Sequence, residues 1–170
     1  MTWVQKELKK NSAAQARNTA PGDGLDQAAQ ARDAAAKIAA LWRQVEDANN
    51  ALPGPLRLQR EVGARESFAV DAPNFPVMLL AQNGACLGFA EDGIRYVWPV
   101  RNRGKSNNFW IRWNTGSGYF VNHRVGSSLS GPIMRDRKFK ASSVDFMLKC
   151  LVRGVRIKPG SVSAKRFWLF

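Results

Sequence analysis

Three features of the sequence predict an α+β fold. An Ala-rich stretch near residues 26–52 has apolar side chains at spacings of three and four, the pattern of an amphipathic helix. Beyond residue 75, apolar residues alternate with polar ones between tight-turn dipeptides, which predicts an antiparallel meander of four or five strands. A second, strongly apolar helix follows these strands, and we expect it to pack on one face of the sheet.

The chain has 170 residues, a length typical of one domain or of one domain with an arm. We expect an N-terminal arm and linker at residues 1–24, an amphipathic helix at 25–55, and a basic sheet-and-helix domain at 56–170. No apolar run is long enough to span a membrane, and the first residues lack the apolar region of a secretory signal. With only two cysteines, the sequence predicts a cytoplasmic protein without a disulfide framework or a metal centre.

The first ten residues predict a short helix with Trp3, Val4 and Leu8 on one side. Such a helix is too short to be stable alone, and the linker after it is rich in small and turn-forming residues. A tethered Trp indicates an arm that docks on a partner protein, and a frayed terminus is the alternative. The Ala-rich helix that follows has large apolar residues only in its second half, and the Pro-Gly-Pro at residues 53–55 ends it.

The strands come after a polar connection at residues 56–74. Asn-Gly at 83–84 and Asp-Gly at 92–93 are strong hairpin signals, and Thr-Gly-Ser-Gly at 115–118 is a third turn. The strands are expected at residues 75–82, 85–90, 94–100, 109–114 and 119–125.

The second helix is expected at residues 142–153. Ser142 or Ser143 would cap its start and Gly154 would end it, while a narrow polar stripe leaves most of its surface apolar. The aromatic run at 166–170 predicts a final short strand in the sheet, or insertion into a partner through Trp168 and Phe170.

The formal net charge of +13 lies entirely in the last seventy residues. Residues 1–100 hold eleven basic and eleven acidic side chains, whereas residues 101–170 hold fifteen basic and two acidic ones. This asymmetry indicates a polyanionic partner, and nucleic acid is the first candidate. The alternatives are another anionic partner, such as an acidic protein or a membrane surface, and a basic charge that only maintains solubility.

Strand alternation sorts the side chains into two faces. One face is apolar enough to be the core: Ile94, Tyr96, Trp98, Phe109, Ile111, Trp113, Tyr119, Val121, His123 and Val125. The other face has an arginine on each of three strands, with aromatic and amide side chains between them. Bases stack on such rings at about 1–3 kcal/mol per base without a sequence requirement, and arginine holds phosphates. With two flanking cationic loops, the predicted nucleic-acid-binding residues are Arg95, Arg101, Arg103, Lys105, Trp110, Arg112, Phe120, Asn122, Arg124, Arg135, Arg137, Lys138 and Lys140.

The sequence therefore predicts a protein that binds single-stranded or structured RNA or DNA, with no catalysis and no cofactor. The order of elements over residues 75–153, a meander followed by a packing helix, resembles that of Whirly- and Pur-type single-strand-binding proteins. This resemblance is at the level of the fold, and no residues carry over from it.

Two other functions remain open. A small basic ribonuclease of the toxin type also places helices before a meander, and here Arg95, Arg112, Arg124 and His123 would stabilise the phosphate and transfer protons without a metal. The alternation, however, places His123 on the core face. The third possibility is an accessory subunit of a larger nucleoprotein assembly that docks through the arm and the C-terminal aromatic residues.

Overall fold

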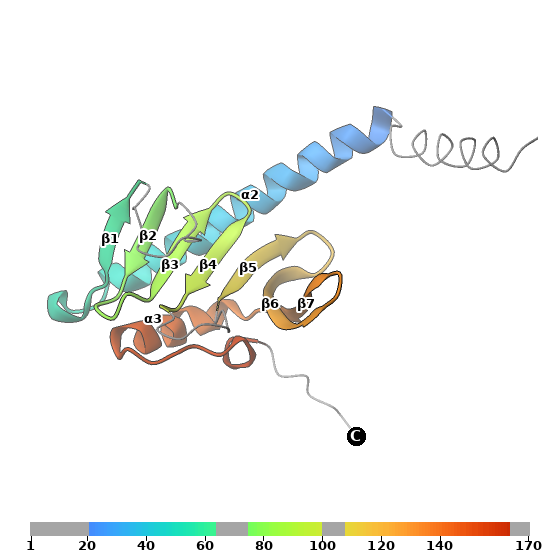
Figure 1. Ribbon diagram of the computed structural model, residues 1–170. Coiled ribbons are helices and arrows are strands. Elements are labelled where there is room, and N and C mark those ends of the chain that lie inside the picture. The colour runs from blue at the N-terminus through green and yellow to red at the C-terminus, as the bar shows by residue number, and fades with distance from the viewer. Residues whose placement is uncertain (1–20, 64–74, 100–107, 164–170) are drawn as a thin grey trace, which may run out of the picture. The chain divides into compact units, whose positions relative to one another are not determined.

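The computed structural model describes residues 21–63, 75–99 and 108–163 (Figure 1). The chain divides after Asp33 into two compact units, and the second unit contains every described strand. Helix α2 (Pro21–Asn50) belongs to both units, and its residues from Ala34 onward are part of the sheet-containing unit. Within the described ranges, no helix is both long and apolar enough to cross a membrane.

The sheet confirms the α+β class, with seven antiparallel strands that neighbour one another in sequence order. The strands are β1 (Gln59–Val62), β2 (Val77–Leu80), β3 (Cys86–Ala90), β4 (Gly93–Val97), β5 (Phe109–Asn114), β6 (Gly118–Ser128) and β7 (Gly131–Lys138). The five strands expected from alternation are β2 to β6. Two more strands, β1 and β7, form the edges of the sheet, where the sequence predicted a polar connection and a cationic loop.

Both unexpected strands lack a buried face. None of the side chains of β1 is buried, and every residue of β7 after Gly131 is exposed. An edge strand of this kind is held by backbone hydrogen bonds to one neighbour, so its sequence needs no apolar alternation. A salt bridge of 2.8 Å between Arg60 and Glu46 also connects β1 to α2.

The predicted turns are formed as their residues require. Gly84 has a φ of +86°, and the side-chain oxygen of Asn83 accepts a hydrogen bond from the Ala85 amide at 3.0 Å. At the β5–β6 hairpin, Gly118 has a φ of +74°, and the side-chain oxygen of Asn114 accepts a hydrogen bond from the Gly116 amide at 2.9 Å. These turns fix the register of the strands that they join.

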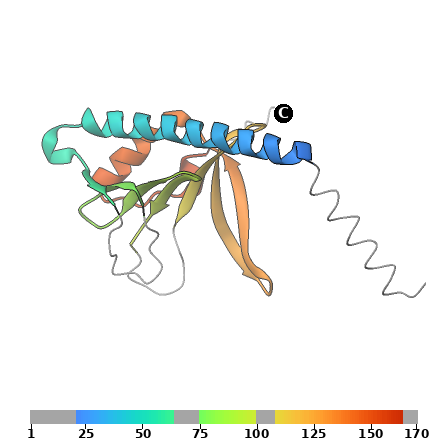
Figure 2. The same ribbon diagram turned by 90° about the horizontal axis from the view of Figure 1, so that it is seen from above.

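Two helices cover one face of the sheet (Figure 2): α2, in its part from Ala34 onward, and α3 (Val144–Val152). The Trp42 ring of α2 stacks on Phe89 of β3 with 5.6 Å between the ring centres. The buried cluster comprises, among others, Ile38, Leu41, Trp42, Val45, Leu79, Leu87, Ile94, Tyr96, Phe109, Ile111, Val121, Met147, Leu148 and Leu151. Most of the residues that the sequence predicted on the core face therefore lie on the face that the helices cover.

Val125 is the exception among the expected core residues, with 45% of its surface exposed. The β6–β7 register shifts between Arg124 and Gly126, which is the signature of a β-bulge. Beyond His123, moreover, β6 pairs with β7 but not with β5, so the helices do not cover this part of the strand.

The end of the described chain has no full strand. Residues 155–157 are extended without strand pairing, and a 3-10 turn, η3 (Pro159–Ser161), follows them. One isolated bridge joins Phe139 to Ser163. The expected final strand at 166–170 lies outside the described residues.

Candidate nucleic-acid interface

The face of the sheet opposite the helices presents the predicted side chains in rows across the strands. Arg95 of β4 is paired with Trp110 of β5, which is paired with Asn122 of β6. In the next row, Arg112 is paired with Phe120, and Phe120 with Lys138 of β7. Cross-strand partners on one face lie about 5 Å apart at Cβ, so these side chains are direct neighbours. We call this surface of β4 to β7 the open face.

Trp110 is the centre of the open face. The guanidinium carbon of Arg95 lies 3.4 Å from the centre of the Trp110 ring, and that of Arg112 lies 4.1 Å from it. Both contacts are within the range of cation–π attraction, and Arg95 is the directly opposite residue while Arg112 is two positions along the same strand. The ring is only half-buried, so it holds two cations in place at the surface.

One carboxylate lies beside these two arginines. Arg112 donates from Nη2 to Oδ2 of Asp92, in the β3–β4 turn, at 3.0 Å. Burial lowers the pKa of Arg95, with Asp92 opposing the change and Arg112 adding to it. Nε of Arg112 is buried and has no hydrogen-bond partner among the described residues. Two guanidinium groups thus share a single carboxylate, and the cluster keeps a net positive charge.

A second carboxylate on the open face reduces its positive charge locally. Asp136 of β7 is paired with Asn122, and the Asn122 amide donates to it at 2.6 Å. The position of this acid was not predicted from the sequence, because residues 135–140 were expected to form a loop. The cationic part of the open face therefore comprises Arg95, Arg112 and Lys138, around Trp110 and Phe120.

The other half of the same sheet face is apolar. Phe75, Met78 and Cys86 form a small buried cluster, against which Leu80 and Val97 pack. The Phe75 ring lies directly over Gly88: a Cβ built at Gly88 would be 2.3 Å from the ring. The contact between Phe75 and Gly88 was not predicted, although a glycine inside a strand is a sign that another group approaches the backbone closely.

The cations of residues 135–140 are divided between two faces, which corrects their grouping as one loop. Arg135 and Arg137 are paired with His123 and Val121, so they are on the helix-covered side of the sheet, while Lys138 is on the open face. Lys140 precedes the 3-10 turn η2 (Ala141–Ser143), which leads into α3.

Several predicted residues cannot be placed. The cations Arg101, Arg103 and Lys105 and the docking residues Trp3, Val4, Leu8, Trp168 and Phe170 all lie outside the described residues.

His123 does not meet the arginines of the open face. It is 9% exposed and lies on the covered face, whereas Arg95, Arg112 and Arg124 are on the other. Burial lowers its pKa, Arg137 and Arg135 lower it further, and hydrogen bonds with the backbone at Val121 and Arg135 oppose the change. The arrangement proposed for a ribonuclease, with this imidazole beside those three guanidinium groups, is therefore not formed.

Arg124 is occupied within its own strand. Its guanidinium donates to the Ser127 hydroxyl and, at 3.2 Å, to the Gly126 carbonyl, so it braces the bulge of β6. Beyond it, the β6–β7 hairpin exposes a group of apolar side chains that sequence reasoning did not identify: Val125, Leu129, Ile133 and Met134. We call residues 124–134 the distal hairpin.

No family model matches the chain, and comparisons with curated proteins and with solved structures find no match. In the part of the chain that the structure describes, no three His, Cys, Asp or Glu side chains gather as metal ligands would. The site must therefore be interpreted from its own geometry.

Proposed function

We propose that the protein binds single-stranded or unpaired segments of RNA or DNA on the open face. The observation that supports this function best is the stack of Arg95 and Arg112 on Trp110, in which two fixed cations lie beside aromatic surface. Arginine planes and aromatic rings are the surfaces on which unpaired bases stack, and guanidinium groups also hold phosphates.

The stack changes how a base would be held. Because guanidinium groups already cover Trp110, a base packs on the outer plane of a guanidinium or on the half-buried ring of Phe120. The ring then acts mainly as a platform that keeps both arginines in one conformation. Such preorganisation lowers the entropy cost of binding.

The size of the open face suits a short stretch of nucleic acid. Strands lie about 4.8 Å apart, so β4 to β7 span about 14 Å. Four-stranded sheets of comparable width stack two or three bases in known RNA-binding modules. A duplex cannot present its bases to a flat sheet in this way, so single strands should be preferred.

Fluorescence anisotropy tests the proposal. Labelled single- and double-stranded DNA and RNA of one sequence are titrated at two salt concentrations, with heparin as a polyanion control. We expect single strands to bind more tightly than duplexes. Trp110→Ala should lose about tenfold in affinity at both salt concentrations, because Arg95 and Arg112 lose the ring that holds them in one conformation. Arg43→Gln, on an exposed position of α2, is the control and should bind as the wild type does.

Two results would contradict the proposal. One is equal affinity for duplex and single strand together with full competition by heparin, which would indicate binding by charge alone. The other is unchanged affinity of Trp110→Ala.

The exposed apolar side chains of the distal hairpin favour a second candidate, an accessory subunit of a nucleoprotein assembly. Leu129 is fully exposed, and Ile133 and Met134 are about half exposed. If the hairpin contacts a protein, Leu129→Ser with Met134→Ser leaves oligonucleotide affinity unchanged. A loss of affinity would instead assign the hairpin to nucleic-acid binding.

A further inference from the structure

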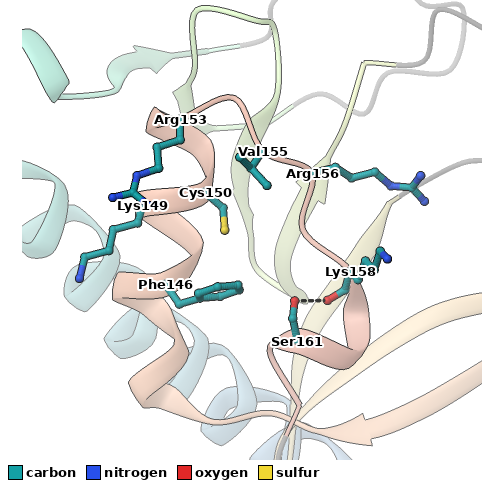
Figure 3. A pocket seen from close by; sticks show the side chains of 8 residues that line it. All are labelled: Phe146, Lys149, Cys150, Arg153, Val155, Arg156, Lys158 and Ser161. Atoms are coloured by element: carbon teal, nitrogen blue, oxygen red, sulfur yellow. Dashed lines mark hydrogen bonds between the residues drawn. The ribbon is translucent and has the colours of Figure 1, made fainter.

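A groove of about 390 Å³ lies between α3 and residues 155–161, which include η3 (Figure 3). From the helix side, three residues of α3 and the residue that caps its end line the groove: Phe146, Lys149, Cys150 and Arg153. The facing wall is formed by Val155, Arg156, Lys158 and Ser161. This groove is separate from the open face, because α3 packs on the opposite side of the sheet.

The floor of the groove is apolar and its rim is cationic. Phe146 and Val155 are 43% and 51% exposed. In Figure 3 the Phe146 ring and the Cys150 sulfur point into the space between the helix and the segment. The side chains of Lys149 and Arg153 extend outward from the helix side, and those of Arg156 and Lys158 extend outward from the facing segment. None of the eight lining residues is acidic.

The polar groups of the groove are poorly suited to a nucleotide base. The only lining hydroxyl, on Ser161, already donates to the Lys158 carbonyl at 2.6 Å. Burial raises the pKa of the Cys150 thiol, with Arg153 opposing the change, so the sulfur is a neutral, weakly polar part of the floor. The side-chain donors left for a ligand are therefore the cationic groups of the rim, which suit carboxylates.

We propose that this groove binds an acidic peptide segment of a partner protein. A large apolar side chain of the peptide rests on Phe146 and Val155, and its carboxylates pair with the cations at the rim: Lys149, Arg153, Arg156 and Lys158. The volume is within the range of ligand pockets, and aromatic anchors with charged rims are typical of peptide-binding surfaces. The complementary charge selects an acidic partner over a basic one.

The test uses the full chain and a short fluorescein-labelled peptide with a central Leu-Phe pair flanked by glutamates. We expect saturable binding, and about tenfold weaker binding for Phe146→Ser, as for the loss of an interface anchor. Leu56→Ser, which changes an equally exposed apolar residue away from the groove, is the matched control and should bind normally.

Charge is tested in the same assay. The double variant Lys149→Gln/Lys158→Gln should bind about fivefold more weakly, since two exposed ion pairs are lost. Arg32→Gln/Arg43→Gln removes the same charge from exposed positions of α2 and should leave the affinity unchanged. A peptide with Ser-Ser in place of Leu-Phe should also bind the wild-type protein weakly. Its affinity should be no higher than that of the Leu-Phe peptide for the Phe146→Ser variant.

Competition with a single-stranded oligonucleotide separates this proposal from the nucleic-acid function. Peptide and oligonucleotide should bind together, and Trp110→Ala should keep the peptide. Displacement of the peptide by the oligonucleotide, or equal binding of the Ser-Ser peptide, would overturn the groove proposal. Failure of oligonucleotide binding with peptide binding intact would overturn only the nucleic-acid function.

Discussion

Gly88 illustrates how one missing side chain shapes the sheet surface. Its position in β3 allows the Phe75 ring to lie flat on the strand and to close the apolar half of the sheet face. On the cationic half, the groups that the described residues place on Trp110 are the guanidinium groups of Arg95 and Arg112. One steric contact at Gly88 thus separates the apolar half of this face from the cationic half.

Gly88→Ala should destabilise the fold by about 1–3 kcal/mol, since the new methyl group would overlap the ring. In a Phe75→Ala background the clash is absent, and the same change should cost nothing or stabilise by about 0.5 kcal/mol, as glycine is unfavourable inside a strand. Urea unfolding of both single variants and the double variant measures this coupling. Gly54→Ala, where no atom lies within 4 Å of the added Cβ, is the control. Additive effects would show that Phe75 does not cover Gly88.

His123 links stability to pH. Its folded-state pKa is below the ordinary value of 6.5 because the ring is buried near Arg137 and Arg135. The unfolded chain therefore binds more protons than the folded chain just below pH 6.5. The neutral imidazole contributes stability above that value, and this contribution is lost as the pH falls toward the folded-state pKa.

His123→Gln should remove this dependence. Urea unfolding of the wild type above and below pH 6.5 should show a fall in the free energy of unfolding as the pH decreases, and the variant should show a smaller fall in the same window. Identical slopes for the two proteins would mean that another group titrates there.

At the scale of elements, what the sequence predicts depends on burial. The strands β2 to β6 and helix α3 are predictable because each buries at least one face, and the hairpin turns fix which strand residues share a face. The strands β1 and β7 are not, because they have no buried side chain to produce a pattern. The bulge after Arg124, which exposes Val125, likewise has no simple sequence signal.

The distal hairpin should be the least protected part of the described sheet. It is paired on one side only, and its side chains are mostly exposed. Amide hydrogen exchange should be fast for residues 126–133, because local opening of the hairpin exposes little additional apolar surface. Exchange should be slow for β3 to β5. The amides of β3, between two paired neighbours, serve as the internal reference. Equal protection would mean that another contact covers the hairpin.

For the molecule as a whole, positive charge is placed on more than one side. Arg95, Arg112 and Lys138 are on the open face, whereas the groove beside α3 has four cations of its own. The sequence predicted the composition of the open face well, because register follows from the turns. It did not predict that the cations of residues 135–140 lie on two faces, that the Phe75 ring packs over Gly88, or that a groove lies beside α3. These features depend on contacts between distant segments.

Salt dependence measures how many cations contact phosphates. The variant Arg95→Gln/Lys138→Gln should reduce the slope of log affinity against log salt by up to about 1.4, at about 0.7 per phosphate contact with a single strand. Arg32→Gln/Arg43→Gln should leave the slope unchanged. Trp110→Ala should lower the affinity while nearly preserving the slope, since it removes no charged group. If the open-face variant kept the wild-type slope, phosphates would be held elsewhere.

The last strand of the meander also bears on self-association. Sheet edges can recruit a strand from another molecule and so begin an aggregate. On β7, Arg135, Asp136, Arg137 and Lys138 are all exposed, and three of these four side chains are cations divided between the two faces. Two copies approaching along this edge would bring these cations to within strand spacing, and their repulsion would oppose growth of the sheet in that direction.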